Sequence, residues 1–210
     1  MAILGIDLGT TNSLGAVYRN GKVELIPNCF GSFLTPSVVS VMEDGSVAVG
    51  QIAKERLITH PKDTAASFKK KMGTTQNYVL GGRNFLPEEL SGFVISAIVE
   101  DARNYLQEDV EDVIISVPAY FHDKQRVATK RAGALAGVMV KRIINEPSAA
   151  ALASYFDTRQ EQLFLVLTLA EVRWMFLSWI VLIQWWRFLQ FPEIIISVEM
   201  ILMKPLPVVS

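Results

Sequence analysis

The stretch ILGIDLGTTNS, residues 3–13, organises the prediction for the whole chain. Its first half is an apolar run bounded by glycine, a pattern typical of a buried β-strand. Asp7 comes at the end of this strand, where a lone carboxylate is costly unless it is paired or lies near a cation. The predicted strand therefore places one acidic side chain, that of Asp7, next to the turn that follows it.

That turn combines Gly9 with Thr10, Thr11 and Asn12. Glycine lets the backbone approach a ligand closely, and the amides that follow it can then point at an anion. Together with Asp7, these residues favour a site for phosphate and magnesium. A hairpin in which Asp7 only caps the turn fits the same residues equally well, so this motif by itself leaves both interpretations open.

The composition excludes several classes of protein. The chain has 210 residues, and its net charge of −1 comes from 20 basic and 21 acidic residues. That balance gives no electrostatic footprint for nucleic acid or an acidic membrane. The single cysteine, Cys29, excludes an internal disulfide framework and fits a reducing compartment, and His60 and His122 form no zinc-binding cluster in the sequence. We expect no signal peptide and a cytoplasmic location.

The order of the predicted elements indicates an α/β protein with a mixed sheet flanked by helices. Asn20-Gly21 is a strong hairpin signal between two apolar runs. Asp123 is expected to cap a helix that ends near Gly137. The predicted strands lie at 3–8, 14–18, 22–26, 36–41, 47–49, 113–117, 138–144 and 163–167, and the predicted helices at 51–60, 87–106, 123–136 and 149–155.

Four further residues could serve the same site. Lys69 opens a run of three lysines that is more typical of a solvated face, although one lysine of the three could turn inward onto phosphate. Pro118 ends a predicted strand, where open α/β sheets collect ligands, and Arg126 lies within reach of that strand end. Glu146 precedes a helix, where it could position water or magnesium. A helix-dipole partner is the simpler explanation of Glu146 by itself.

Four motifs together resemble the seventy-kilodalton heat-shock chaperones (heat shock protein 70, DnaK type). They are ILGIDLGTTNS at 3–13, SFKKKMG at 67–73, VIISVPAYFHDKQR at 113–126 and RIINEPSAAALA at 142–153. The resemblance implies an actin-like ATPase domain of two lobes, each built on a ribonuclease-H-like βββαβα core. This chain would supply only the first lobe, at 1–167, with an inserted outer subdomain at about 36–110.

The resemblance also implies cofactors for the opening motif. Gly9, Thr10, Thr11 and Asn12 would hold the phosphates of ATP, and Thr10 would also belong to the catalytic group. Asp7 would bind Mg²⁺ through water. ATP and Mg²⁺ are thus the implied cofactors, and the opening stretch would form one half of an ATP clamp.

The later motifs carry the remaining roles that the resemblance implies. Lys69 would orient the attacking water or the γ-phosphate, and Glu146 would lie near the magnesium. Pro118 and Arg126 would form a switch that reports the nucleotide state to a peptide-binding domain. The implied partners of the intact family are unfolded client polypeptides and J-domain co-chaperones. Such chemistry, phosphoryl transfer to water, depends mainly on positioning and charge stabilisation.

After residue 167 the chain departs from the family. The family places a second phosphate loop of the form DLGGGT there, whereas this chain has TLAEVRWMFLSWI at 168–180. All four tryptophans lie in this tail, and all 13 glycines lie at or before Gly137. The uncharged run Trp174–Trp186 is shorter than the roughly 20 residues that span a bilayer, so no membrane span is expected. An interfacial or aggregating segment remains an alternative.

The genetic code offers a sharper explanation, namely that residues 168–210 are translated out of frame. We suppose that one base, a G, is missing after the codon of Leu167. Codons permitted for 168–180, shifted by one base, then encode DLGGGTLDVSVLD, and 192–203 is compatible with GDNHLGGDDFD. Methionine and tryptophan have single codons, and the bases that they force agree with this frame. Sequencing the gene across codon 167 tests the hypothesis.

These inferences predict an ATP-binding chaperone of the heat shock protein 70 type, which couples ATP hydrolysis to protein folding. Because the second lobe and the peptide-binding domain are missing from the sequence, we expect ATP turnover to be weak or lost in this chain. Another actin-like ATPase, such as a sugar kinase, is one alternative, since the opening turn is shared across that superfamily. A non-functional fragment is the other.

Overall fold

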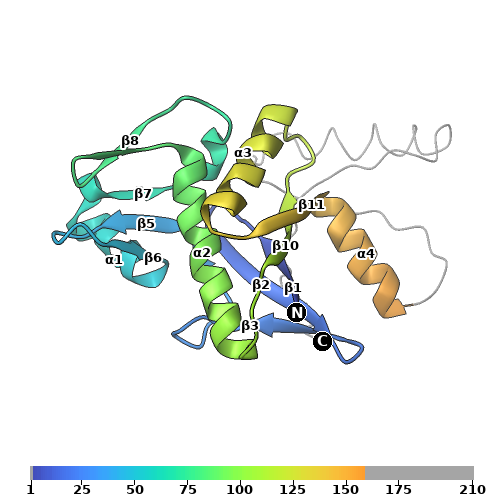
Figure 1. Cartoon of the computed structure of the whole chain (residues 1–210). Helices are drawn as coiled ribbons and strands as arrows, with labels where there is room; N and C mark the ends of the chain where they lie inside the picture. The colour runs from blue at the N-terminus through green and yellow to red at the C-terminus, as the bar shows by residue number, and fades with distance from the viewer. Residues whose placement is uncertain (1, 159–210) are drawn as a thin grey trace, which may run out of the picture. The chain divides into compact units, whose positions relative to one another are not determined.

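The computed structural model describes residues 2–158 (Figure 1). The described residues divide between Ile144 and Asn145 into two units. The strand expected at 163–167 and the tail from residue 168 lie outside the described residues.

The first unit is built on a mixed sheet with the strand order β11-β10-β1-β2-β3. Its strands are β1 (Ile3–Asp7), β2 (Asn12–Arg19), β3 (Lys22–Ile26), β10 (Asp112–Val117) and β11 (Met139–Asn145), and β4 (Thr35–Pro36) also pairs with β2. β1 runs parallel to β10 and antiparallel to β2, and β2 runs antiparallel to β3. The predicted α/β class with a mixed sheet is confirmed.

The hairpin predicted at Asn20-Gly21 is confirmed. Both residues have positive φ angles, 51° and 78°, and Arg19 pairs with Lys22 on either side of them. Positive φ at both central positions matches the twist of the flanking strands, which is why this dipeptide is a reliable local signal.

One face of the sheet is covered by α2 (Pro87–Leu106), and α3 (Asp123–Leu135) packs beside α2 (Figure 1). Alternation along the strands turns Leu4, Ile6 and Val17 toward this helix, and all three are buried. From α2, Leu90, Val94, Ile95 and Ile98 complete the same core. The helix predicted at 87–106 has the bounds that the structure shows.

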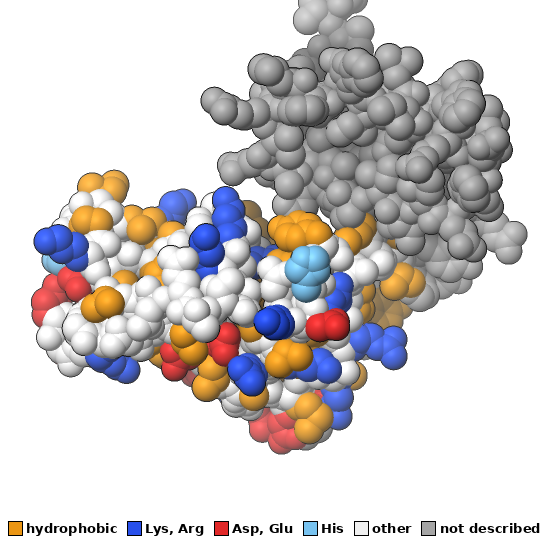
Figure 2. Space-filling model, turned by 90° about the horizontal axis from the view of Figure 1, so that it is seen from above, with side chains coloured by type: hydrophobic (Ala, Val, Ile, Leu, Met, Phe, Trp, Pro, Cys, Tyr) orange, Lys and Arg blue, Asp and Glu red, His pale blue; other side chains and the backbone are white. Residues whose placement is uncertain are grey.

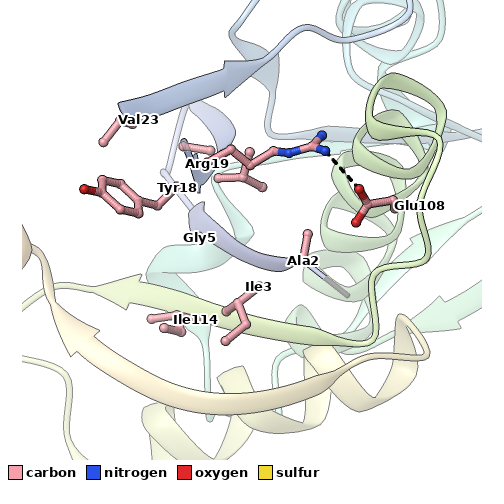
Figure 3. A pocket seen from close by; sticks show the side chains of 10 residues that line it. Ala2, Ile3, Gly5, Tyr18, Arg19, Val23, Glu108 and Ile114 are labelled. Atoms are coloured by element: carbon pink, nitrogen blue, oxygen red, sulfur yellow. Dashed lines mark hydrogen bonds and ion pairs between the residues drawn. The ribbon is translucent and has the colours of Figure 1, made fainter. Parts of the chain in front are cut away.

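Side chains of the first unit on the opposite face of the sheet are accessible to solvent. Ile3, Tyr18 and Val23 are more than half exposed there, and they line a hollow of about 720 Å³ (Figure 3). An ion pair joins Arg19 to Glu108, with 3.0 Å between Nη2 and Oε1. This hollow contains none of the residues that the sequence assigns to the site.

A second group of short elements lies between β4 and α2. Its sheet has the order β6-β5-β7, and a separate hairpin is formed by β8 and β9. The elements are β5 (Val38–Val41), β6 (Val47–Val49), α1 (Gln51–Thr59), the 3₁₀ turn η1 (Pro61–Asp63), β7 (Thr64–Ala66), the 3₁₀ turn η2 (Phe68–Lys71), β8 (Tyr78–Leu80) and β9 (Arg83–Phe85). The hairpin of β5 and β6 and the helix α1 match the prediction. The three-residue strands β7, β8 and β9 are too short to show a hydrophobic pattern in the sequence.

Two local predictions need correction. Asp123 does not cap α3: His122 is the cap residue, and its amide donates to Gln125 Oε1 at 2.9 Å. Asp123 is the first helical residue, where its charge complements the helix dipole. The last described helix, α4 (Glu146–Thr158), is longer at both ends than the predicted 149–155. Its earlier start is possible because Pro147 is tolerated in a first helical turn.

None of the helices within residues 2–158 is long and apolar enough to cross a lipid bilayer.

Candidate functional site

Asp7 lies where the parallel strands β1 and β10 end side by side. It pairs in register with Ser116 of β10, whose Oγ donates to Asp7 Oδ1 at 2.7 Å. The Asp7 side chain nevertheless stays exposed. The serine therefore orients the carboxylate while leaving it accessible, at the edge where open α/β sheets bind ligands.

Two buried serines, Ser13 and Ser37, hold the turn between β1 and β2 in place through hydrogen bonds. The amide of Gly9 donates to Ser13 Oγ at 3.1 Å, and the carbonyl of Gly9 accepts from Ser37 Oγ at 2.8 Å. The two hydroxyl groups lie 2.9 Å apart, and the amide of Ser37 donates to the carbonyl of Thr11 at 2.8 Å. The turn is therefore preorganised by protein contacts alone.

Gly9 is required by the turn itself. A Cβ atom at this position would lie 1.9 Å from the carbonyl oxygen of Asn12, a distance that no relaxation of a side chain could relieve. The sequence motif predicts that Gly9 allows the close approach of a ligand. The structure adds a different reason, which is that the backbone folds back on itself here.

The groups that remain available at this turn are hydroxyls. Thr10 is half-buried and Thr11 is exposed, and neither hydroxyl has a hydrogen-bond partner within residues 2–158. Asn12 is also exposed and begins β2. Because the amide of Gly9 is already bonded to Ser13, an anion at this turn would be bound by the threonines and Asn12.

The lysine run divides into one buried and two exposed side chains. Lys69 is only 4% exposed, whereas Lys70 and Lys71 are exposed to solvent. All three lie in the 3₁₀ turn η2, which follows Ser67 in the left-handed conformation at φ 57°. This geometry agrees with the expectation that one lysine turns inward.

Pro118, Arg126 and Lys69 are connected through a residue that the sequence analysis did not single out, Phe121. The amide of Phe121 donates to the carbonyl of Pro118 at 3.0 Å, and Arg126 Nε donates to the carbonyl of Phe121 at 3.0 Å. Lys69 Nζ lies 5.8 Å from the centre of the Phe121 ring. Phe121 thus contacts all three.

Four residues of this site are not predicted by any sequence motif: Ser13, Ser37, Ser116 and Phe121. Ser13, Ser116 and Phe121 lie inside quoted motifs, but serine and phenylalanine are common enough to carry no signal by themselves. Ser37 lies far from the turn in sequence, and no local pattern points to it. Glu146, a residue predicted for the site, begins α4 in the second unit. Contacts within the first unit join Asp7 to Ser116, and Phe121 to Lys69, Pro118 and Arg126.

The surface of the described residues carries mixed charge. On the face in Figure 2, Lys and Arg side chains are dispersed among apolar and acidic ones. Within residues 2–158, no three His, Cys, Asp or Glu side chains lie close enough together to hold a metal ion. A cation at Asp7 would therefore take further ligands from water and from the bound anion.

A sequence model of the family described as Hsp70 protein matches residues 3–80 and 77–171 of this chain. The chain belongs to the Hsp70 family. It is also 46% identical over 172 residues to the chaperone protein DnaK of Endomicrobium trichonymphae. That match covers 80% of this chain and 28% of the DnaK sequence, so the chain spans little more than a quarter of this relative.

Membership of the Hsp70 family bears on the site directly. It is a family of nucleotide-binding chaperones with an actin-like ATPase fold, and the observed mixed α/β sheet is consistent with that fold. All the candidate site residues of this Hsp70 chain, from Asp7 to Glu146, fall inside the matched region. The match favours the chaperone family over the sugar kinases that the opening turn alone left open.

Proposed function

We propose that this chain carries the first lobe of an actin-like ATPase domain and binds ATP with Mg²⁺ at the turn after β1. Three features of the first unit support this proposal: the exposed carboxylate of Asp7, the turn held by Ser13 and Ser37, and the burial of Lys69. In the same proposal, the group of short elements between β4 and α2 belongs to the outer subdomain at about 36–110.

The residues at the site suit a magnesium–phosphate group. Phosphate oxygens accept hydrogen bonds, and the hydroxyls of the half-buried Thr10 and the exposed Thr11 can donate them. Magnesium prefers oxygen ligands and keeps several waters, so one accessible carboxylate, Asp7, is enough from the protein side. A buried ammonium such as Lys69 is stabilised when an anion binds next to it.

Each residue then has one physical task. Thr10, Thr11 and Asn12 bind the phosphates, and Asp7 orients water around the cation. Lys69 places a positive charge where negative charge develops on the transferring phosphoryl group. Bound Mg²⁺ supplies charge neutralisation. Glu146 positions water.

The whole-protein activity belongs to the same proposal. An intact relative would couple ATP hydrolysis to the folding of client polypeptides in the cytoplasm, assisted by J-domain co-chaperones, with Pro118 and Arg126 reporting the nucleotide state. In this chain we propose that residues 168–210 are out of frame and that ATP turnover is impaired. The family match ends at residue 171, which supports a change of frame near codon 167.

Isothermal titration of residues 1–210 with ATP and Mg²⁺ tests the binding site. We expect Lys69→Met to weaken binding by roughly tenfold to a hundredfold, the range for a charge-assisted contact. Lys70→Met is the matched control, because Lys70 is the exposed neighbour in the same turn, and it should leave the affinity unchanged. A chain that gives no binding heat would refute the proposed site.

A phosphate-release assay tests the claim about turnover. We expect little magnesium-dependent ATP hydrolysis by residues 1–210, because under the proposed change of frame residues 168–180 do not encode the second phosphate loop of the family. Hydrolysis at the level of an intact relative would show that the claim is wrong. Sequencing the gene across codon 167 tests the frameshift, and an unbroken frame that encodes residue 168 onward would rule it out.

A further inference from the structure

We propose that Ser37 is a positioning residue for the phosphate-binding turn at residues 9–12. Its hydroxyl and its amide each donate to a carbonyl of that turn, and they polarise the two peptide groups that carry the amides of Thr10 and Asn12. A more polarised amide is a stronger donor to an anion. This inference rests on the proposed nucleotide site, because it gives Ser37 a role in binding the phosphates there.

The first support is the place of Ser37 in the fold. It lies between β4 and β5, and the pairing of Pro36 with Asn12 holds it beside the turn. Ser37 is only 2% exposed, so little water competes for its hydroxyl. Hydrogen bonds in such a buried setting are electrostatically stronger than in water.

The second support is a count of the hydrogens on the two buried hydroxyls. The carbonyl of Gly9 can only accept, so the single hydroxyl hydrogen of Ser37 is used in the 2.8 Å bond to it. Ser37 Oγ must therefore accept in its 2.9 Å contact with Ser13 Oγ. Ser13 Oγ in turn accepts from the amide of Gly9 at 3.1 Å. These bonds form a closed ring in one direction, from the amide of Gly9 back to its own carbonyl.

A ring with this single direction strengthens its last bond. A hydroxyl that accepts a hydrogen bond becomes a better donor, so the polarisation accumulates at the bond from Ser37 to the carbonyl of Gly9. That carbonyl belongs to the same peptide group as the amide of Thr10. Electron density drawn toward the oxygen leaves the N–H of Thr10 more positive.

The third support is a second bond from the same residue. The amide of Ser37 donates to the carbonyl of Thr11 at 2.8 Å, and that carbonyl shares a peptide group with the amide of Asn12. Within residues 2–158 the amide of Thr10 makes no hydrogen bond, so it is available to a phosphate oxygen. Ser37 thus acts on two neighbouring peptide groups of the turn.

Nuclear magnetic resonance of the full chain labelled with ¹³C and ¹⁵N tests the polarisation, through signals that correlate each amide with the preceding carbonyl. We expect Ser37→Ala to move the carbonyl ¹³C signal of Gly9 and the amide ¹⁵N signal of Thr10 upfield, because the hydroxyl donor is lost. The signal that joins Thr11 to Asn12 is the internal control, since the backbone bond from residue 37 remains. An unchanged Gly9–Thr10 signal in folded Ser37→Ala would refute the proposal.

Ser13→Ala provides a second test, which remains decisive if Ser37→Ala does not fold. In this variant Ser37 keeps its bond to the carbonyl of Gly9 but loses the hydrogen that it accepts from Ser13. We expect the Gly9–Thr10 signal to move in the same direction as in Ser37→Ala, by a smaller amount. A carbonyl signal of Gly9 that does not move would refute the ring and the polarisation that depends on it.

Isothermal titration with ATP and Mg²⁺ connects the polarisation to binding. We expect Ser37→Ala to weaken binding by about twofold to tenfold, the range for one neutral hydrogen bond. Ser40→Ala is the matched control, because Ser40 is equally buried but bonds to the carbonyl of Asp63 and to Thr64, outside the turn. It should lower the stability and leave the affinity unchanged.

The same titration separates this inference from the proposed function. A parent chain that binds no ATP would overturn the proposed function, while a moved Gly9–Thr10 signal in Ser37→Ala would still support the polarisation. If the parent binds ATP and Ser37→Ala binds it equally tightly, the positioning role alone is overturned. Equal weakening by Ser37→Ala and Ser40→Ala would also overturn it, since the effect would then arise from stability.

Discussion

The geometry of the site depends on the backbone atoms of Gly9 and on the carboxylate of Asp7. Gly9 is bonded through both its amide and its carbonyl, and its missing side chain leaves room for the carbonyl of Asn12. Asp7 is oriented by one serine hydroxyl and remains exposed. At this scale the sequence motif and the local geometry agree, although the reason for glycine differs from the expected one.

Gly9→Ala should destabilise the chain, because the new methyl group would overlap the backbone of Asn12. We expect a loss of about 1–3 kcal/mol or more in the free energy of unfolding, measured by urea denaturation. Gly5→Ala is the control, since a Cβ there meets only the carbonyl of Ala16 at 3.4 Å. Equal stability of the two variants would show that the turn is not constrained as described.

Asp101 should make stability depend on pH. Burial, and to a lesser extent the neighbouring charge of Glu100, raises the pKa of Asp101 above its ordinary value of 3.8. The folded state therefore holds this proton more tightly than the unfolded state. The stability that the proton confers is lost as the pH rises from 3.8 through the raised folded pKa.

Asp101→Asn tests this dependence, because the amide keeps an oxygen that can accept the 3.1 Å hydrogen bond from the amide of Cys29. We expect the variant to have a higher melting temperature than the parent at pH 7, with the difference shrinking toward pH 4. A difference that stays constant over this range would contradict the assignment.

At the scale of elements, the site is held by the packing of α2 on the sheet. Gly15 of β2 lies directly under Ile98 of α2, and a Cβ there would come within 2.8 Å of Ile98 Cγ2. The absence of a side chain lets the helix approach the strand that begins at Asn12. This close approach links the core to the turn.

Gly15→Ala should therefore lower the free energy of unfolding by about 1–3 kcal/mol through overpacking. Ile98→Ala removes the clashing methyl group, so the double variant should be less destabilised than the sum of the two single variants. A double-mutant cycle by chemical denaturation measures the coupling. Strict additivity would mean that the helix and the strand do not meet at this point.

At the scale of the whole molecule, the chain is a family member that spans 28% of its DnaK relative. The sheet face that carries Ile3, Tyr18 and Val23 is open in the first unit. The sequence of the tail adds an uncharged, tryptophan-rich run at Trp174–Trp186. Exposed apolar surface such as that sheet face favours association, and an apolar tail sequence would add to this tendency.

Deleting residues 168–210 should reduce aggregation. We expect residues 1–167 to scatter less light than the full chain during refolding at equal concentration. The full chain with Ile180→Lys and Leu182→Lys is the matched control, since it keeps the length but interrupts the apolar run, and it should scatter less than the parent. If neither change lowers the scattering, aggregation does not arise from the tail.

The sequence by itself determined the elements whose signals are local. Asn20-Gly21 specified the first hairpin through its turn conformation, the apolar spacing of α2 specified that helix, and the four motifs identified the family before any contact was known. Tertiary structure alone decided which lysine is buried, that Ser37 bonds to Gly9, and that Phe121 joins Lys69 to Arg126. The physical reason is distance along the chain. Periodicity and turn chemistry act between neighbours, whereas Ser116 reaches Asp7 across 109 positions, and only the packed core brings such residues together.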